Sequence, residues 1–94
     1  MYRPLPDNLT IRNSEIEGLG LFATRDISKG TTLGMSHFYW GEKLMRTPLG
    51  AFYNHSDTPN CVKTRTDSRY FLVAINDIKS GEEITVTYTF YDIE

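Results

Sequence analysis

Short segments rich in β-forming residues, separated by turns that contain glycine, run through almost all of this chain. No stretch repeats its apolar residues about every 3.6 positions over three turns, which is the pattern of an amphipathic helix. β-Branched and aromatic residues favour strands, whereas glycine favours the tight turns between them. The sequence therefore predicts a mostly β fold with many short strands and little helix.

The predicted strands follow the β-forming segments, and we expect them over residues 9–16, 21–24, 31–40, 61–66, 69–75 and 84–88. Glycine marks predicted turns at residues 18–20, 28–30 and 78–81. Asp67-Ser68 is expected to join two neighbouring strands as a hairpin. Thr47-Pro48-Leu49-Gly50 breaks the chain again, and residues 51–55 fit either a short helical turn or an irregular loop.

Length and composition indicate one domain. Its 94 residues divide into an expected extended arm over residues 1–8, which hold two of the four prolines, and a core over residues 9–91. With 39% hydrophobic and 23% charged residues, the chain is ordinary for a soluble globular protein. The net charge of −2 leaves no basic footprint, so direct binding to nucleic acid is not expected.

Cysteine content and apolar patterning exclude further classes of protein. Cys61 is the one cysteine, which excludes an intramolecular disulfide and the common multi-cysteine zinc sites. No apolar run is long enough for a transmembrane helix, and residues 1–7 lack the apolar stretch of a signal peptide. We therefore expect an intracellular protein with no membrane partner and no bound metal.

Gly18-Leu19-Gly20 is a candidate ligand-binding turn, because glycine permits close approach of the backbone to a ligand. An isolated Gly-Xaa-Gly is more often an ordinary β-turn. A dinucleotide fingerprint is not indicated, because the third glycine and a following helix are missing.

Asn54-His55-Ser56 is a second candidate motif. A lone histidine is usually a surface or hydrogen-bonded core residue, and no second ligand beside it indicates a metal site. A Ser-His hydrolase with Ser56 as nucleophile is conceivable. However, adjacent residues rarely present their side chains to each other, and no nucleophile elbow is present.

Three segments, in their order along the chain, resemble the SET-domain protein lysine methyltransferases: Glu17–Ala23, Asn54–Cys61 and Gly81–Tyr88. The resemblance covers residues 9–91. It implies a SET-domain β-clip of several short-stranded sheets, in which the C-terminal segment threads through a loop as a pseudoknot. It also implies transfer of a methyl group from S-adenosylmethionine to the side-chain amine of a lysine in a protein substrate.

The resemblance assigns roles to individual residues. The implied cofactor-binding residues are Glu17, Gly18, Leu19, Gly20, Phe22, Asn54 and His55. Tyr88 matches the catalytic tyrosine of the family, and Tyr39, in Tyr39-Trp40-Gly41-Glu42, matches a tyrosine beside the target lysine. The implied substrate channel is lined by Tyr39, Val86 and Phe90.

The chain departs from the family pattern at two places. The insert between Gly41 and Gly50 is almost absent, and six residues follow Tyr88, so no post-SET lid is expected. Asp57 stands where many members have a zinc-binding cysteine, which indicates a zinc-free subgroup. Two alternatives stay open: another amine as the acceptor, or a cofactor- or protein-binding module that has lost catalysis.

The size of the chain resembles that of very short viral and bacterial SET proteins, some of which are homodimers. A small, mostly β domain has a small core and open strand edges, which favours a two-fold homodimer. The aromatic residues expected at this contact are Phe38, Trp40, Phe90 and Tyr91. The expected location is the cytoplasm, or the host nucleus for a viral protein in a eukaryote.

Overall fold

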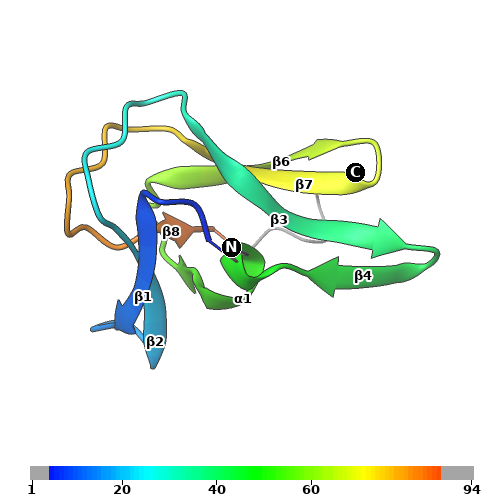
Figure 1. Ribbon diagram of the computed structural model, residues 1–94, viewed down its shortest axis with the longest axis horizontal. Coiled ribbons are helices and arrows are strands. Elements are labelled where there is room, and N and C mark those ends of the chain that lie inside the picture. The colour runs from blue at the N-terminus through cyan, green and yellow to red at the C-terminus, as the bar shows by residue number, and fades with distance from the viewer. Residues whose placement is uncertain (1–4, 88–94) are drawn as a thin grey trace.

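The computed structural model describes residues 5–87, and Figure 1 shows that this part of the chain consists of short strands and one short helix. In chain order, the elements are β1 (Leu9–Asn13), β2 (Leu19–Ala23), β3 (Thr32–Trp40), β4 (Lys43–Arg46), α1 (Pro48–Phe52), β5 (Asn54–His55), β6 (Cys61–Thr66), β7 (Arg69–Ala74) and β8 (Thr85–Val86). The mostly β prediction is therefore confirmed. The single helix is too short to span a membrane, and the described residues contain no other helix.

The strands form two sheets. β1 and β2 make an antiparallel hairpin, and the other six strands form a sheet in the order β4-β3-β7-β6-β8-β5. Figure 1 shows the β1–β2 hairpin at one end of the molecule and the β3–β4 hairpin at the other. β2 is tied to the segment before β8 by a bridge between Phe22 and Glu83, and by a hydrogen bond from Ile84 N to Leu21 O. The hairpin is thereby held beside the larger sheet.

β8 lies between β5 and β6, which follow one another in the sequence. It runs parallel to both, pairing Thr85 with Asn54 and Val86 with Cys61. The chain therefore returns from a distance and inserts a strand between two strands that follow one another in the sequence. Residues 88–91 of the expected pseudoknot lie outside the described residues.

The hairpin expected over residues 61–75 is confirmed. β6 and β7 pair in register from Cys61 with Ala74 to Thr66 with Arg69. At the turn, Asp67 adopts a φ of 55°, in the left-handed region that aspartate tolerates better than most residues.

Other boundaries differ from the prediction. The break expected at residues 47–50 is the start of α1, because the Thr47 side chain accepts a hydrogen bond from Gly50 N and proline fits the first helical turn. β1 ends at Asn13 instead of residue 16, because the Ser14 side chain turns the chain. Gly20 lies within β2 instead of the preceding turn, and β4 was not predicted.

Both sheets and the helix contribute to one hydrophobic core. Its fully buried side chains include Leu21, Leu72, Ile78, Ile84 and Val86. Burial of an aliphatic side chain of this size stabilises a fold by roughly 1.5–3 kcal/mol. Leu5, from the expected N-terminal arm, packs against the core from outside.

Candidate functional site

Three distant segments of the chain meet at the loop between β1 and β2. Asn54 of β5 is buried, and its Nδ2 lies 2.7 Å from Glu83 Oε2 and 3.1 Å from Ser14 Oγ. The same nitrogen lies 3.2 Å from the carbonyl oxygen of Glu17 and 3.4 Å from that of Leu19. Because a side-chain amide has two hydrogens, Asn54 donates to two of these acceptors at a time. The loop, β5 and the segment before β8 therefore share one polar network.

Ser14 organises the loop itself. Its Oγ donates to Glu83 Oε1 at 2.9 Å. It also accepts hydrogen bonds from the backbone nitrogens of Ile16, at 2.9 Å, and Glu17, at 3.3 Å. A serine hydroxyl has one hydrogen and two lone pairs, so the nitrogens of Ile16, Glu17 and Asn54 share the two lone pairs while the hydrogen goes to Glu83.

Gly18 in the loop and Gly20 in β2 play different roles. A Cβ on Gly20 would overlap Glu83 Oε2 and lie 3.0 Å from both Glu83 Cδ and Ser14 Cβ. Gly18 has a φ of 46°, and nothing lies within 4 Å of the position where its Cβ would stand. Gly20 therefore permits close packing inside the molecule, whereas Gly18 presents an open stretch of backbone at its surface.

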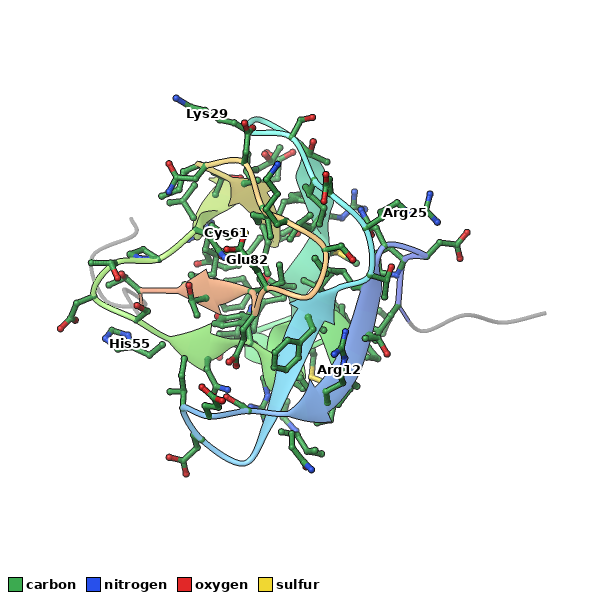
Figure 2. All side chains as sticks on the ribbon, turned by 90° about the vertical axis from the view of Figure 1, so that its left-hand side faces the viewer. Arg12, Arg25, Lys29, His55, Cys61 and Glu82 are labelled. Carbon is green, nitrogen blue, oxygen red and sulfur yellow. The ribbon has the colours of Figure 1, made fainter. Side chains whose placement is uncertain are left out.

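The expected cofactor-binding residues surround this network. Glu17, Gly18, Leu19 and His55 are exposed, Gly20 and Asn54 are buried, and Phe22 is half-buried. Figure 2 shows His55 at the periphery of the molecule, where its Nε2 lies 3.2 Å from Asp57 Oδ1. Arg12 lies over the Phe22 ring, with the guanidinium carbon 5.3 Å from the ring centre.

A hollow of about 340 Å³ borders the network and is lined by Asn13, Glu15, Phe22, Gly81 and Glu83. Its two carboxylates give it an acidic lining, which attracts cationic groups.

Asn60 holds β8 in place next to this network. Its Oδ1 accepts a hydrogen bond from Thr85 N at 2.9 Å, and its Nδ2 donates to the Glu83 carbonyl at 2.8 Å. The chain continues from β8 to Tyr88, which lies outside the described residues. Asn60 therefore fixes the strand that leads to the expected catalytic tyrosine.

Tyr39, the other expected catalytic residue, lies on β3 among cations and a second tyrosine. Its ring centre is 6.3 Å from that of Tyr70. The Arg65 guanidinium carbon is 5.4 Å from the Tyr39 ring centre and 5.5 Å from that of Tyr70, and Lys63 Nζ is 5.4 Å from the latter. These separations are those of cation–π contacts, so the surroundings of Tyr39 are aromatic and positively charged.

His37, next to Tyr70, has a pKa that reflects burial and the nearby positive charges. It is buried, its ring packs edge-on against Tyr70, and its Nδ1 lies 3.0 Å from Ser36 Oγ. Burial, with further contributions from Lys63 and Arg46, lowers the pKa of His37 to about 4. The interior of β3 therefore disfavours a protonated base.

The remaining expected catalytic and channel residues fall into two groups. Val86 is fully buried in the hydrophobic core, and Tyr88 and Phe90 lie outside the described residues. The roles of these residues stay predictions. No group of three or more His, Cys, Asp or Glu residues suited to a metal occurs within residues 5–87.

Sequence reasoning missed Ser14, Glu83 and Asn60 as site residues. Glu83 and Asn60 stand inside the segments that carry the family resemblance, so a search for polar side chains in those segments could have found them. Ser14 has a weaker signal, because a serine before a turn usually bonds only to its own backbone.

Comparisons with known proteins agree with this fold. A family model described as SET domain matches residues 34–89. Histone-lysine N-methyltransferase trr of Drosophila melanogaster is 30% identical over 122 residues, which cover 94% of this chain and 5% of that protein.

Solved structures show the same architecture. A Plasmodium falciparum chain classed as a histone methyltransferase aligns with a TM-score of 0.74 and 24% identity, over 90% of this chain and 96% of that one. The methyltransferase domain of human PR domain-containing protein 2 aligns with a TM-score of 0.72 and 18% identity, over 90% and 79%. Polycomb Repressive Complex 2 of Chaetomium thermophilum, bound to S-adenosylmethionine, gives 0.73 and 22%, over 85% and 15%. At these identities the likeness establishes the fold.

Proposed function

This chain belongs to the SET-domain family, and from this premise we propose that it transfers a methyl group from S-adenosylmethionine to a lysine side chain of a protein. The observation that carries the proposal is the shared network of Ser14, Asn54 and Glu83 beneath the Glu17–Leu19 loop. It joins all three sequence segments that resemble the family. We also propose that the protein is intracellular and that it binds neither nucleic acid nor membrane directly.

The residues around the loop fit the proposed cofactor. The backbone at Gly18 is open, with nothing within 4 Å of its Cβ position, so a ligand can approach the main chain closely. His55 and Leu19 are exposed beside it, and the Glu17 carboxylate can attract a cation. S-adenosylmethionine would supply a methyl group on a cationic sulfur. The loop and β5 would bind and orient it.

The acceptor amine must be neutral before it is methylated, and free lysine has a pKa of about 10.4. Burial and the nearby cations Lys63 and Arg46 lower the pKa of His37, and the Arg65 guanidinium beside Tyr39 would in the same way oppose protonation of a nearby amine. A target lysine that enters beside Tyr39 would therefore lose its proton more readily than in water. Val86 and Phe90 complete the proposed channel.

Tyr88 is the proposed catalytic residue, and it would orient the amine through its hydroxyl group. Because little proton transfer accompanies methyl transfer itself, positioning should provide most of the acceleration. The Asn60 contacts fix β8, which ends two residues before Tyr88 in the sequence.

Cofactor binding is the first test of the proposal. Calorimetry with S-adenosylhomocysteine and a chelator should detect binding by the purified chain. Asn54→Ala removes the buried amide that holds the loop, and we expect it to weaken binding by about 1–3 kcal/mol. Asn76→Ala, at an exposed asparagine, is the matched control. Absence of heat and of a thermal shift at millimolar ligand would contradict the proposal.

Turnover by Tyr88→Phe is the second test, once mass spectrometry of methylated host proteins has identified a substrate. Loss of the hydroxyl should lower kcat and leave cofactor affinity unchanged, because the group acts on the reacting atoms. Tyr91→Phe serves as the control. An unchanged kcat would remove Tyr88 from its proposed role.

A binding module without catalysis is the second candidate function. The observation that favours it is the short connection between β3 and β4, which consists of Gly41 and Glu42. A larger insert at this place would contribute to a peptide groove. Cofactor binding without methyl transfer to any host protein would support the module over the enzyme.

A further inference from the structure

Glu83 has its carboxylate directed towards the β1–β2 loop and β5, although sequence reasoning assigned it no role. Its Oε1 accepts from the Ser14 hydroxyl at 2.9 Å, and its Oε2 accepts from Asn54 Nδ2 at 2.7 Å. Ser14 is 69 positions away in the sequence and Asn54 is 29 positions away. Glu83 therefore joins the β1–β2 loop to β5.

The carboxylate fixes the direction of the hydrogen bonds around it. An ionised carboxylate only accepts, so Ser14 must turn its single hydrogen towards Glu83. The lone pairs of Ser14 then face the backbone N–H groups of Ile16 and Glu17, which donate to them. The two backbone N–H groups of the loop thus donate to a hydroxyl group that Glu83 orients.

Asn54 is directed inwards by the same carboxylate. Its shortest hydrogen bond is to Glu83, and its second hydrogen has Ser14 Oγ and the carbonyl oxygens of Glu17 and Leu19 within reach. The Asn54 amide nitrogen therefore donates hydrogen bonds within the protein, to Glu83 and to the Glu17–Leu19 loop, and is not directed at a ligand.

Packing confirms how closely Glu83 approaches the hairpin. Glycine at position 20 leaves the space that the carboxylate occupies, because a Cβ there would overlap Glu83 Oε2 and the Glu83 side chain would have to move away. The bridge between Phe22 and Glu83 holds the two backbones at this distance.

We propose that Glu83 is a positioning residue, which acts through Ser14 and Asn54 to hold the Ile16–Leu19 loop in the conformation that receives the cofactor. The inference rests on the proposed function for the identity of the ligand, whereas the ordering of the loop is a property of the free protein. Glu83 makes no contact with substrate in this role.

The test compares the full-length parent with Glu83→Gln, Glu83→Ala and the matched control Glu82→Gln. Glutamine at position 83 keeps the shape but turns one acceptor into a donor. Glu82 is an exposed neighbour whose carboxylate caps the Lys79 backbone nitrogen, and Figure 2 shows it among the labelled side chains. Two readouts are needed: amide hydrogen exchange of the free protein and calorimetric binding of S-adenosylhomocysteine.

In Glu83→Gln, the amides of Ile16 and Glu17 should exchange roughly tenfold faster than in Glu82→Gln, while those of the β6–β7 hairpin keep their rates. The dissociation constant of S-adenosylhomocysteine should rise by roughly the same factor. Glu83→Ala should show larger changes of the same kind, and Glu83→Gln decides the question if the alanine variant does not fold.

Unchanged exchange in the loop, or equal acceleration throughout the protein, would overturn the positioning role. Local acceleration without a change in affinity would also overturn it. A parent that binds no S-adenosylhomocysteine would overturn the proposed function, and local acceleration in Glu83→Gln would then still support the ordering of the loop by Glu83.

Discussion

At the scale of single residues, His37 couples the fold to pH. The folded protein lowers its pKa from 6.5 to about 4, chiefly because the ring is buried, and also because Lys63 and Arg46 are near. The unfolded chain therefore binds more protons than the folded chain between these two values. The contribution of His37 to the free energy of unfolding is therefore fully present above pH 6.5 and is lost as the pH falls towards 4.

We predict that the free energy of unfolding decreases by up to about 3 kcal/mol between pH 7 and pH 4 through His37 alone. Urea unfolding at several pH values measures this, and His37→Gln should flatten the pH dependence relative to the parent. His55→Gln, which replaces an exposed histidine, is the control. Parallel curves for His37→Gln and the parent would show that His37 carries none of the effect.

At the scale of elements, α1 packs directly against β3. Thr47 caps the helix and also donates from Oγ1 to the Met35 carbonyl at 2.7 Å. A Cβ on Gly50 would overlap the Ser36 carbonyl oxygen and lie 3.1 Å from His37 Cε1. The helix can therefore approach β3 closely because Gly50 has no side chain at the contact.

We predict that Gly50→Ala destabilises the protein by about 1–3 kcal/mol, because the methyl group must push α1 away from β3. Intrinsic helix propensity alone predicts a gain of about 1 kcal/mol, so the two explanations differ in sign. Ala51→Gly, on the exposed side of the same helix, should lose only about 1 kcal/mol. An equal or raised denaturation midpoint for Gly50→Ala would contradict the close packing.

At the scale of the whole molecule, the β3–β4 hairpin extends from the body (Figure 1), and several of its apolar side chains are exposed. Trp40 is 75% exposed, Met45 42% and Leu44 37%. β4 is also an edge strand of the six-stranded sheet. Of the other aromatics expected at a dimer contact, Phe38 is half-buried, and Phe90 and Tyr91 lie outside the described residues.

We predict that the chain forms a two-fold dimer in which this hairpin is covered, because exposed apolar edge strands promote association. Light scattering at micromolar concentration should give twice the mass of the 10.8 kDa chain. Trp40→Ser should shift the equilibrium to the monomer. Arg25→Ser should not, because Arg25 is exposed and lies outside the β3–β4 hairpin. A single-chain mass for the parent, with and without cofactor, would contradict the dimer.

The sequence by itself determined the features that depend on neighbouring residues. Alternating β-forming segments were sufficient for the β6–β7 hairpin, because its strands are adjacent and the turn at Asp67-Ser68 joins them. The ordered motifs were sufficient for the family, which the match over residues 34–89 confirms. Strand ends were less predictable, since the β1 boundary depends on what the Ser14 hydroxyl bonds to.

Only the tertiary structure decided which distant polar groups share a network. β5 has two residues, too few for any periodic signal, whereas β8 lies within the strand predicted over residues 84–88. The two strands pair because the chain returns to place one beside the other, and the local sequence does not show this pairing. That return brings Glu83 within hydrogen-bond reach of Ser14 and Asn54. A carboxylate beside a turn looks the same in the sequence whether it faces water or the interior. The packed sheet decides between the two, because burial requires that each carboxylate oxygen finds a donor.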